Sequence, residues 1–143
     1  MTTTLIADVD LMATNIKTQI LSIDSQIKVV LYSPTLEIIR GKFGVNILPS
    51  NITTREFTGR QTLPDYVFTL PIYRTLDAEE EYPATWLSLL NLMNSIADKL
   101  FNNLVDGVST ATINVEFNDD IIATRDRLIN GTIICTYKKY ASR

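Results

Sequence analysis

An amphipathic stretch from Trp86 to Leu104 constrains the fold more than any other part of this sequence. Its apolar residues recur at intervals of three or four, which is the spacing that lines one face of an α-helix. These residues are Trp86, Leu89, Leu90, Met93, Ile96, Ala97, Leu100, Phe101 and Leu104. Pro83 suits the first helical turn, and Gly107 follows the end of the stretch. We expect this face to pack on the core of the domain, in preference to lining a ligand pocket.

The N-terminal segment carries a second helical stripe, which predicts a helix over about residues 5–24. The stripe consists of Leu5, Val9, Met12, Ile16, Ile20, Ile23 and Ile27. Asp8 and Asp10 fall early in this segment, where acidic side chains interact favourably with the N-terminal end of a helix dipole. We expect the stripe to pack on the domain's own sheet rather than on a partner helix.

Alternating and β-branched residues predict strands between the two helices. Short strands are expected at about residues 28–32, 43–48 and 53–58, followed by an exposed loop at 59–65. The clearest strand covers residues 66–73 and places on one face Tyr66, Phe68, Leu70 and Ile72. Because Pro71 cannot donate a ladder hydrogen bond, we expect it at an edge, a bulge or an unpaired side. An edge strand there would be a surface able to accept another chain.

Two more strands are predicted in the last third of the chain. Ile113, Val115 and Phe117 alternate with polar residues, and residues 132–140 are rich in β-branched and aromatic side chains. Two connections fit the pattern. Asn130-Gly131 could form a type I′ hairpin that joins 124–129 to 132–137. Alternatively, residues 118–127 form one long charged loop between two paired strands.

The composition is that of a folded globular domain. A chain of 143 residues buries roughly 70% of its unfolded surface, so it can form a core without metal or disulfide. Hydrophobic residues make up 45% of the chain and charged residues 20%, which are ordinary values. With no internal repeat or linker in the pattern, we expect a single α+β domain over residues 1–143.

The sequence contains no histidine, and this absence bears on every common catalytic class. Nucleophile–histidine pairs and histidine bases are excluded, and zinc lacks its usual ligands. The single Cys135 lies in an apolar run and is interpreted as a small buried hydrophobe. The formal net charge of −3 argues against general affinity for nucleic acid or anionic membrane. With no signal peptide or membrane span expected, we predict an intracellular protein that is not an enzyme, binds no cofactor and works through its surfaces.

Two groups of charged residues suggest possible binding sites. Glu116, Asp119 and Asp120 could hold Mg²⁺ in a small nuclease, with a lysine such as Lys138 nearby in sequence. A strand that runs into an acidic turn gives the same string, so a solvated, partner-facing loop is preferred. The segment that contains Arg55 and Arg60 could contact phosphate, but an ion pair between subunits fits equally well.

The order of these elements resembles the tail terminator proteins of long-tailed phages and their neck-region relatives. The resemblance covers nearly the whole chain. It rests on the N-terminal helix, the strand–loop–strand from Val45 to Tyr73, the helix from Trp86 to Leu104, the strand Ile113–Phe117, the turn Asn118-Asp119-Asp120 and the terminal segment Gly131–Tyr137.

The resemblance implies an α+β fold in which two main helices pack on one side of a mostly antiparallel sheet. It implies a structural virion protein without catalytic residues, which closes into a six-fold ring. Such a ring caps the tail tube, stops its polymerisation and presents an interface for head–tail joining. The implied partners are copies of the chain itself, the tail tube protein and the head–tail connector or neck proteins. DNA would pass through the ring without specific binding, no membrane would be involved, and assembly would occur in the host cytoplasm.

The resemblance also directs attention to charged loops at residues 53–65 and 118–127. A cyclic ring needs two different, complementary patches on each subunit, which an acidic link at 79–81 and a basic loop could supply. The candidate interface residues are Arg55, Arg60, Glu79, Glu80, Glu81, Asp119, Asp120, Arg125 and Arg127. Alternatives are another neck, head-completion or tail-completion subunit, the Mg²⁺-dependent nuclease, and a host adaptor domain with ordinary binding surfaces.

Overall fold

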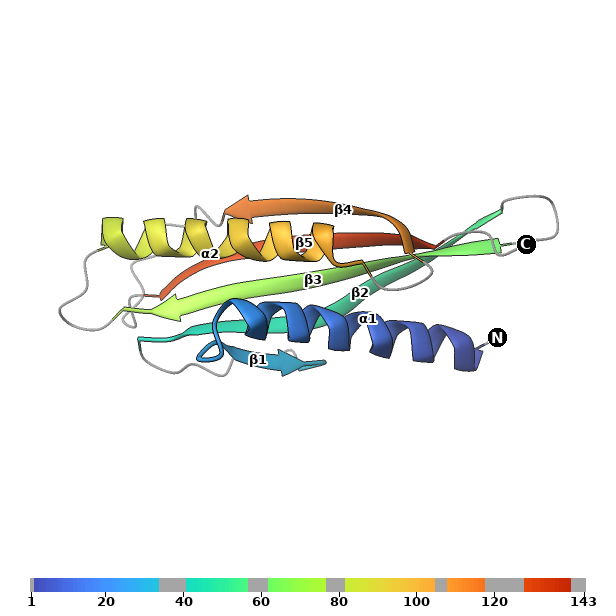
Figure 1. Cartoon of the computed structure of the whole chain (residues 1–143), viewed down its shortest axis with the longest axis horizontal. Coiled ribbons are helices and arrows are strands. Elements are labelled where there is room, and N and C mark those ends of the chain that lie inside the picture. The colour runs from blue at the N-terminus through green and yellow to red at the C-terminus, as the bar shows by residue number, and fades with distance from the viewer. Residues whose placement is uncertain are drawn as a thin grey trace.

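Two helices and five strands make up the computed structural model, which describes residues 2–33, 41–56, 62–76, 82–104, 108–117 and 128–139 (Figure 1). The elements in chain order are α1 (Thr2–Ile23), β1 (Lys28–Leu31), β2 (Phe43–Glu56), β3 (Thr62–Thr75), α2 (Tyr82–Asn102), β4 (Val108–Phe117) and β5 (Leu128–Lys139). The two stretches predicted to be helical are therefore confirmed as helices.

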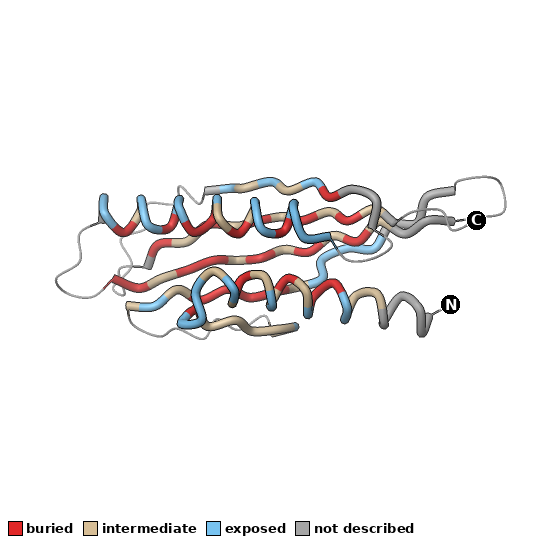
Figure 2. Tube along the Cα trace, in the orientation of Figure 1, coloured by how far each residue is buried: buried red, intermediate tan, exposed pale blue. Residues whose placement is uncertain are grey.

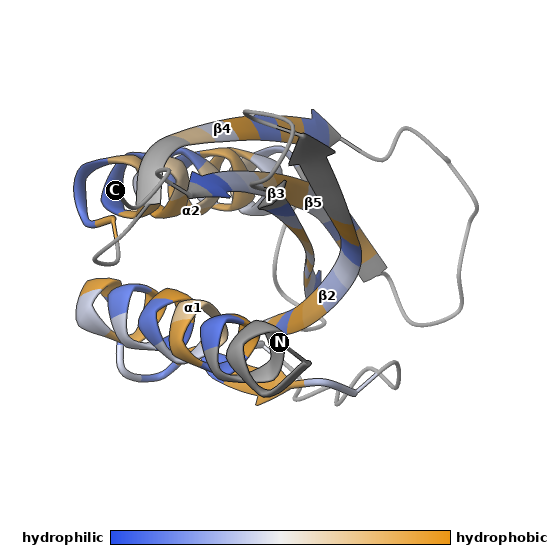
Figure 3. Cartoon of the chain, turned by 90° about the vertical axis from the view of Figure 1, so that its right-hand side faces the viewer, coloured by the Kyte–Doolittle hydropathy of each residue, from blue (hydrophilic) through white to orange (hydrophobic). Residues whose placement is uncertain are grey.

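The five strands form one sheet in the order β1-β2-β3-β5-β4. β1 runs parallel to β2, and every other neighbouring pair is antiparallel. Viewed along the strands, both helices lie on the concave side of the curved sheet (Figure 3). The expected fold class, an α+β fold with a mostly antiparallel sheet and two helices on one side, is confirmed.

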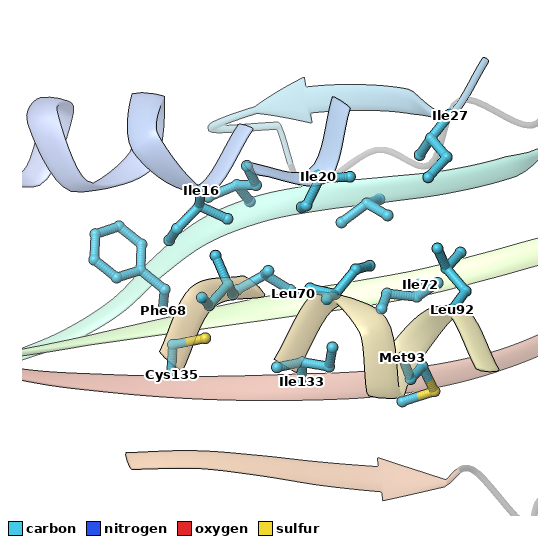
Figure 4. Packing of buried hydrophobic residues seen from close by; sticks show 14 of the residues in the cluster. Ile16, Ile20, Ile27, Phe68, Leu70, Ile72, Leu92, Met93, Ile133 and Cys135 are labelled. Carbon is cyan, nitrogen blue, oxygen red and sulfur yellow. The ribbon is translucent and has the colours of Figure 1, made fainter. Parts of the chain in front are cut away.

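The core fills the space between the helices and the concave face of the sheet (Figures 2 and 4). In β3 the predicted face is fully buried, with Tyr66, Phe68, Leu70 and Ile72 turned away from solvent. The helices contribute Met12, Ile16, Ile20, Leu89, Met93, Ile96 and Leu100. The apolar residues that alternate along the strands and those that recur every 3.6 residues along the helices thus pack together in one apolar layer.

Cys135 lies inside this core, as expected for a small hydrophobe (Figure 4). Burial raises the pKa of its thiol to about 12. The thiolate, which is the reactive form of cysteine, is therefore almost absent at neutral pH.

α1 begins at Thr2, earlier than predicted, which changes the interpretation of two acidic residues. Asp8 and Asp10 lie about two turns inside the helix, so the prediction that they favour its N-terminus is wrong. Both carboxylates instead accept hydrogen bonds from tyrosines. The hydroxyl of Tyr66 donates to Asp8 at 2.8 Å, and that of Tyr32 donates to Asp10 at 2.9 Å. These bonds attach α1 to β3 and to the residue that follows β1.

β2 is one strand of 14 residues where two shorter strands were predicted. Its pairing with β3 shifts register between Pro49 and Asn51, so β2 continues through a local irregularity just beyond residue 48, where the first of the two strands was expected to end. β3 in turn begins at Thr62, inside the segment predicted as a loop.

Pro71 does not lie at an edge, because β3 is flanked by β2 and β5. The prediction of an edge position, and of β3 as a surface that accepts another chain, is wrong. The paired positions of β2 and β3 pass from Val45–Ile72 directly to Leu48–Thr69. The missing donor of Pro71 therefore falls within an interruption of the ladder, which agrees with the alternative of an unpaired side.

The Asn130-Gly131 hairpin is also wrong, because β5 runs straight through both residues and pairs with β3 and β4. The alternative, in which two paired strands are joined through residues 118–127, has the correct pairing; the joining segment lies outside the described residues.

Gly131 has a packing role. A Cβ there would lie 2.7 Å from Sδ of Met93 and 3.2 Å from the carbonyl oxygen of Glu116, so glycine allows α2 to approach the sheet.

Candidate subunit interface

The charged residues predicted as interface contacts lie outside the side chains that the structure describes. Arg55 belongs to β2 by its backbone alone. The others, which fall in segments outside the described ranges, are Arg60, Glu79, Glu80, Glu81, Asp119, Asp120, Arg125 and Arg127. Their role at an interface stays a prediction.

Glu116 is the one described member of the acidic group considered for Mg²⁺. It is exposed on β4 and pairs with Thr132 of β5. Lys138 pairs with Thr110, six positions further along the same strands, which separates the two by roughly 20 Å. Lys138 is therefore not the lysine beside a metal held by Glu116. Within the described ranges, no group of three or more histidine, cysteine, aspartate or glutamate residues could hold a metal ion.

The two edges of the described sheet are formed by different strands. β1 has four residues and lies at one edge, and β4 has ten residues and lies at the other. An edge strand presents backbone N–H and C=O groups on the side away from its neighbour, and these groups can pair with a strand of another chain.

The side chains of β4 alternate between two rows. Thr112, Asn114 and Glu116 are exposed and point away from the helices. Ile113 and Val115 are partly buried against the core. The edge therefore has a polar outer row and an apolar inner row, both accessible to a neighbouring strand.

The apolar face predicted for α2 divides into two parts. Leu89, Met93, Ile96 and Leu100 are buried together with Leu92, which the predicted stripe omitted. Leu90, Phe101 and Leu104 are exposed instead, at 36%, 60% and 36%. The expectation that the whole face packs on the core is therefore wrong for these residues. With Leu87, which is 61% exposed, they form what we term the apolar flank: Leu87, Leu90, Phe101 and Leu104.

The apolar flank lies on the side of α2 that faces away from α1. The amide of Asn15 in α1 donates to the carbonyl of Asn103 at 3.0 Å, and a shallow groove between the helices is lined by Ile23, Ser95 and Lys99. At 100° per residue, Ser95 and Lys99 lie on the opposite side of the buried row from the flank. Figure 1 shows β4 running along that free side of α2. The flank and the open edge therefore belong to the same side of the domain.

The spacing of the flank matches a helix-packing seam. Positions 87, 90, 94, 97, 101 and 104 alternate intervals of three and four, with Asn94 and Ala97 between the two apolar pairs. The four flank side chains together expose on the order of 400 Å² of apolar surface, divided between a pair at each end of α2. The flank thus lies beside β4, an edge strand of the described sheet.

The opposite side of the domain presents β1 in a fixed position. Val29 and Leu31 pack against the core, so Lys28 and Val30 form the outer row of this strand. Tyr32, which ends β1, has a φ of 61° and donates its N–H to the carbonyl of Ile47 at 2.9 Å. This left-handed backbone is uncommon for a tyrosine, and the hydrogen bond holds it in place. The β1 edge is therefore short and well anchored.

Comparisons with known proteins bear on the fold. No family model matches the sequence, and no curated protein matches it. Twenty-seven chains of solved structures are similar in structure to this chain. One of them aligns with a TM-score of 0.54 and 13% identity, covering 96% of this chain and 97% of the other. This similarity supports the fold alone. In the described part of the chain, neither helix has the length and apolarity needed to cross a bilayer.

Proposed function

We propose that this chain is a structural subunit of a long-tailed phage, which closes into a six-fold ring and caps the tail tube. The ring stops tube polymerisation and provides the interface for head–tail joining. The observation that carries this proposal is that β4 lies at one edge of the described sheet beside the apolar flank of α2, with a different strand, β1, at the other edge.

Unequal edges favour a ring over a closed pair. A two-fold dimer uses the same patch on both copies, whereas a ring joins one patch to a different patch of the next copy. Here the β4 edge lies beside the apolar flank of α2. The β1 edge is short and is anchored by the hydrogen bond of Tyr32. A head-to-tail contact uses both edges in every subunit and leaves none open to aggregation.

The distal part of the β2–β3 hairpin is the element we assign to the tail tube. Among the described residues, β5 pairs with β3 from Asp65 onward, and Thr62–Pro64 of β3 pair with β2. Figure 1 shows this pair of strands extending past the N-terminus of α1. Pro49–Ile52 of β2 pair with Tyr66–Phe68, next to this part of the hairpin, and are exposed, with Ile52 at 41%. A two-stranded arm of this kind offers backbone and side-chain contacts outside the body of a ring.

Tube polymerisation in the presence of the purified protein tests the proposal. Electron microscopy is expected to show rings at tube ends and tubes that stop growing once capped. A variant with Leu87→Gln and Phe101→Gln in the flank is expected to leave the tubes uncapped, since it weakens the ring. Tubes that grow to the same length with and without the protein would refute the proposal. A head-completion or tail-completion subunit would use the same ring but would bind the connector in place of the tube end.

A further inference from the structure

We propose that adjacent copies join by pairing β4 of one copy with β1 of the next, antiparallel, with Glu116 opposite Lys28. This inference rests on the proposed ring. It assigns the strands through which one copy of the chain contacts the next. The sheet would then continue from one subunit to the next, with its helices on one side throughout.

The strand directions carry the first step. β1 runs parallel to β2, β3 runs opposite to β2, β5 opposite to β3 and β4 opposite to β5. β1 and β4 therefore point in opposite directions within one subunit. A neighbour related by rotation about an axis along the strands places its β1 antiparallel to β4, so a regular antiparallel ladder can form between them.

The alternation of side chains carries the second step. With Glu116 opposite Lys28, Val115 lies opposite Val29 and Ile113 lies opposite Leu31. All four of these apolar residues are on the helix side of their own sheets and pack partly against the core. Asn114 then lies opposite Val30 on the outer face. A slip of one residue would bring the helix face of one sheet opposite the outer face of the next, with Val115 opposite Lys28 or Val30, so the register is specified to within steps of two residues.

The levels of the two strands differ from this register by two residues. Within one subunit, Val29 is level with Val45, Ile72, Gly131 and finally Phe117 through successive pairings. β1 is thus at the level of the C-terminal part of β4. The proposed pairing of Val29 with Val115 needs a stagger of two residues, or about 7 Å. Strands that tilt as a sheet closes on itself are staggered in this way.

Charge selects between the registers that preserve the faces. Glu116 is exposed and is the only acidic residue among the described side chains of β4, at positions 111–116. Lys28 is the only charged residue of β1. Directly opposite charges stabilise a cross-strand pair, and like charges destabilise it. The unstaggered register would place Val30 opposite Glu116 and leave this complementarity unused.

Disulfide trapping tests the pairing directly. Val30→Cys with Asn114→Cys places two thiols opposite each other across the interface, and the native Cys135 is buried and does not interfere. Oxidation of this double variant is expected to give a ladder of linked subunits on a non-reducing gel. A mixture of the two single variants is expected to give linked pairs and nothing larger. Asn114→Cys that cross-links by itself would mean a two-fold β4–β4 contact and would overturn the proposal.

Two controls fix the register. Val30→Cys combined with Thr112→Cys or with Glu116→Cys moves one thiol by two residues, and at least tenfold less linked product is expected. More product with Glu116→Cys than with Asn114→Cys would overturn the proposed register.

Charge reversal supplies an independent measurement without thiols. Glu116→Lys or Lys28→Glu alone should weaken association about tenfold, and the two together should restore it. Failure of the double reversal to restore association would also count against the pairing.

These outcomes separate the interface from the function. Rings at tube ends without register-specific cross-links would refute the strand pairing and leave the capping function intact. A cross-linked ladder from a protein that leaves tube growth unchanged would support the pairing and refute the capping function. Thermal unfolding of each variant confirms that the substitutions leave the subunit folded.

Discussion

Replacing the two most exposed residues of the apolar flank should strongly weaken association while leaving the subunit stable. Leu87→Gln and Phe101→Gln change side chains that are 61% and 60% exposed in the isolated subunit. Glutamine retains good helix propensity, and surface substitutions of this kind change the free energy of unfolding by about 0.5 kcal/mol or less. The subunit should therefore unfold at nearly the same temperature.

The effect on association is much larger if the flank is buried between copies. Full burial of a leucine or phenylalanine stabilises by about 1.5–3 kcal/mol, so burying the exposed three-fifths of each contributes about 1–2 kcal/mol. The double variant should lose about 2–4 kcal/mol at each interface, which is a roughly 30-fold to 700-fold weaker dissociation constant. Sedimentation velocity over a range of concentrations measures this shift.

Leu11 provides the matched control. It is 53% exposed on α1, outside the flank. Leu11→Gln removes an apolar area similar to that of Leu87→Gln alone and should change the association constant by less than about twofold. Equal weakening by Leu11→Gln and by Leu87→Gln would show that general hydrophobicity, and not this surface, drives association. Unchanged association of the flank variant would refute the reasoning outright.

Three further substitutions or treatments test the fold. Gly44→Ala should lower the free energy of unfolding in urea by about 1–3 kcal/mol, because its Cβ would lie 2.6 Å from the phenolic oxygen of the buried Tyr73; an unchanged midpoint would contradict this packing. Cys135 should resist a thiol reagent at pH 8 until the protein unfolds, since burial raises its pKa to about 12, and rapid labelling of native protein would contradict its burial. Partial burial and the hydrogen bond to Asp10 raise the pKa of Tyr32 to about 12, above the ordinary value near 10. The hydroxyl of Tyr32 should therefore stabilise the fold fully below pH 10 and progressively less as the pH rises to 12. Over this interval the free energy of unfolding, followed by circular dichroism, should fall less in Tyr32→Phe than in the unmodified protein.

The sequence predicted the elements whose pattern is local and long. Both helical stripes and the buried face of β3 follow from periodicity alone, since each repeats over several turns or pleats. Errors appeared where one residue had two possible meanings. Pro49 suggested the end of a strand but lies at a register shift, and Gly131 suggested a turn but makes room for Met93. Sequence pattern does not distinguish a glycine needed by the backbone from one needed by a neighbour.

The interface surface depends on non-local information. Which strand lies at an edge is decided by the order of the whole sheet, so Pro71 pointed to β3 when the edges are β1 and β4. The flank was assigned to the core because Leu90 and Phe101 share the helical spacing of buried residues. A signal for it was present in Leu87 and in the alternating intervals of three and four from 87 to 104. Two overlapping stripes on one helix indicate two packing partners.

The mass and symmetry of the purified protein test the central claim most directly. Native mass measurement combined with class averages from electron microscopy, on the protein alone and with tail tubes, determines both. We predict closed six-fold rings that sit on tube ends. A protein that stays monomeric at every accessible concentration and does not bind the tubes would contradict the account.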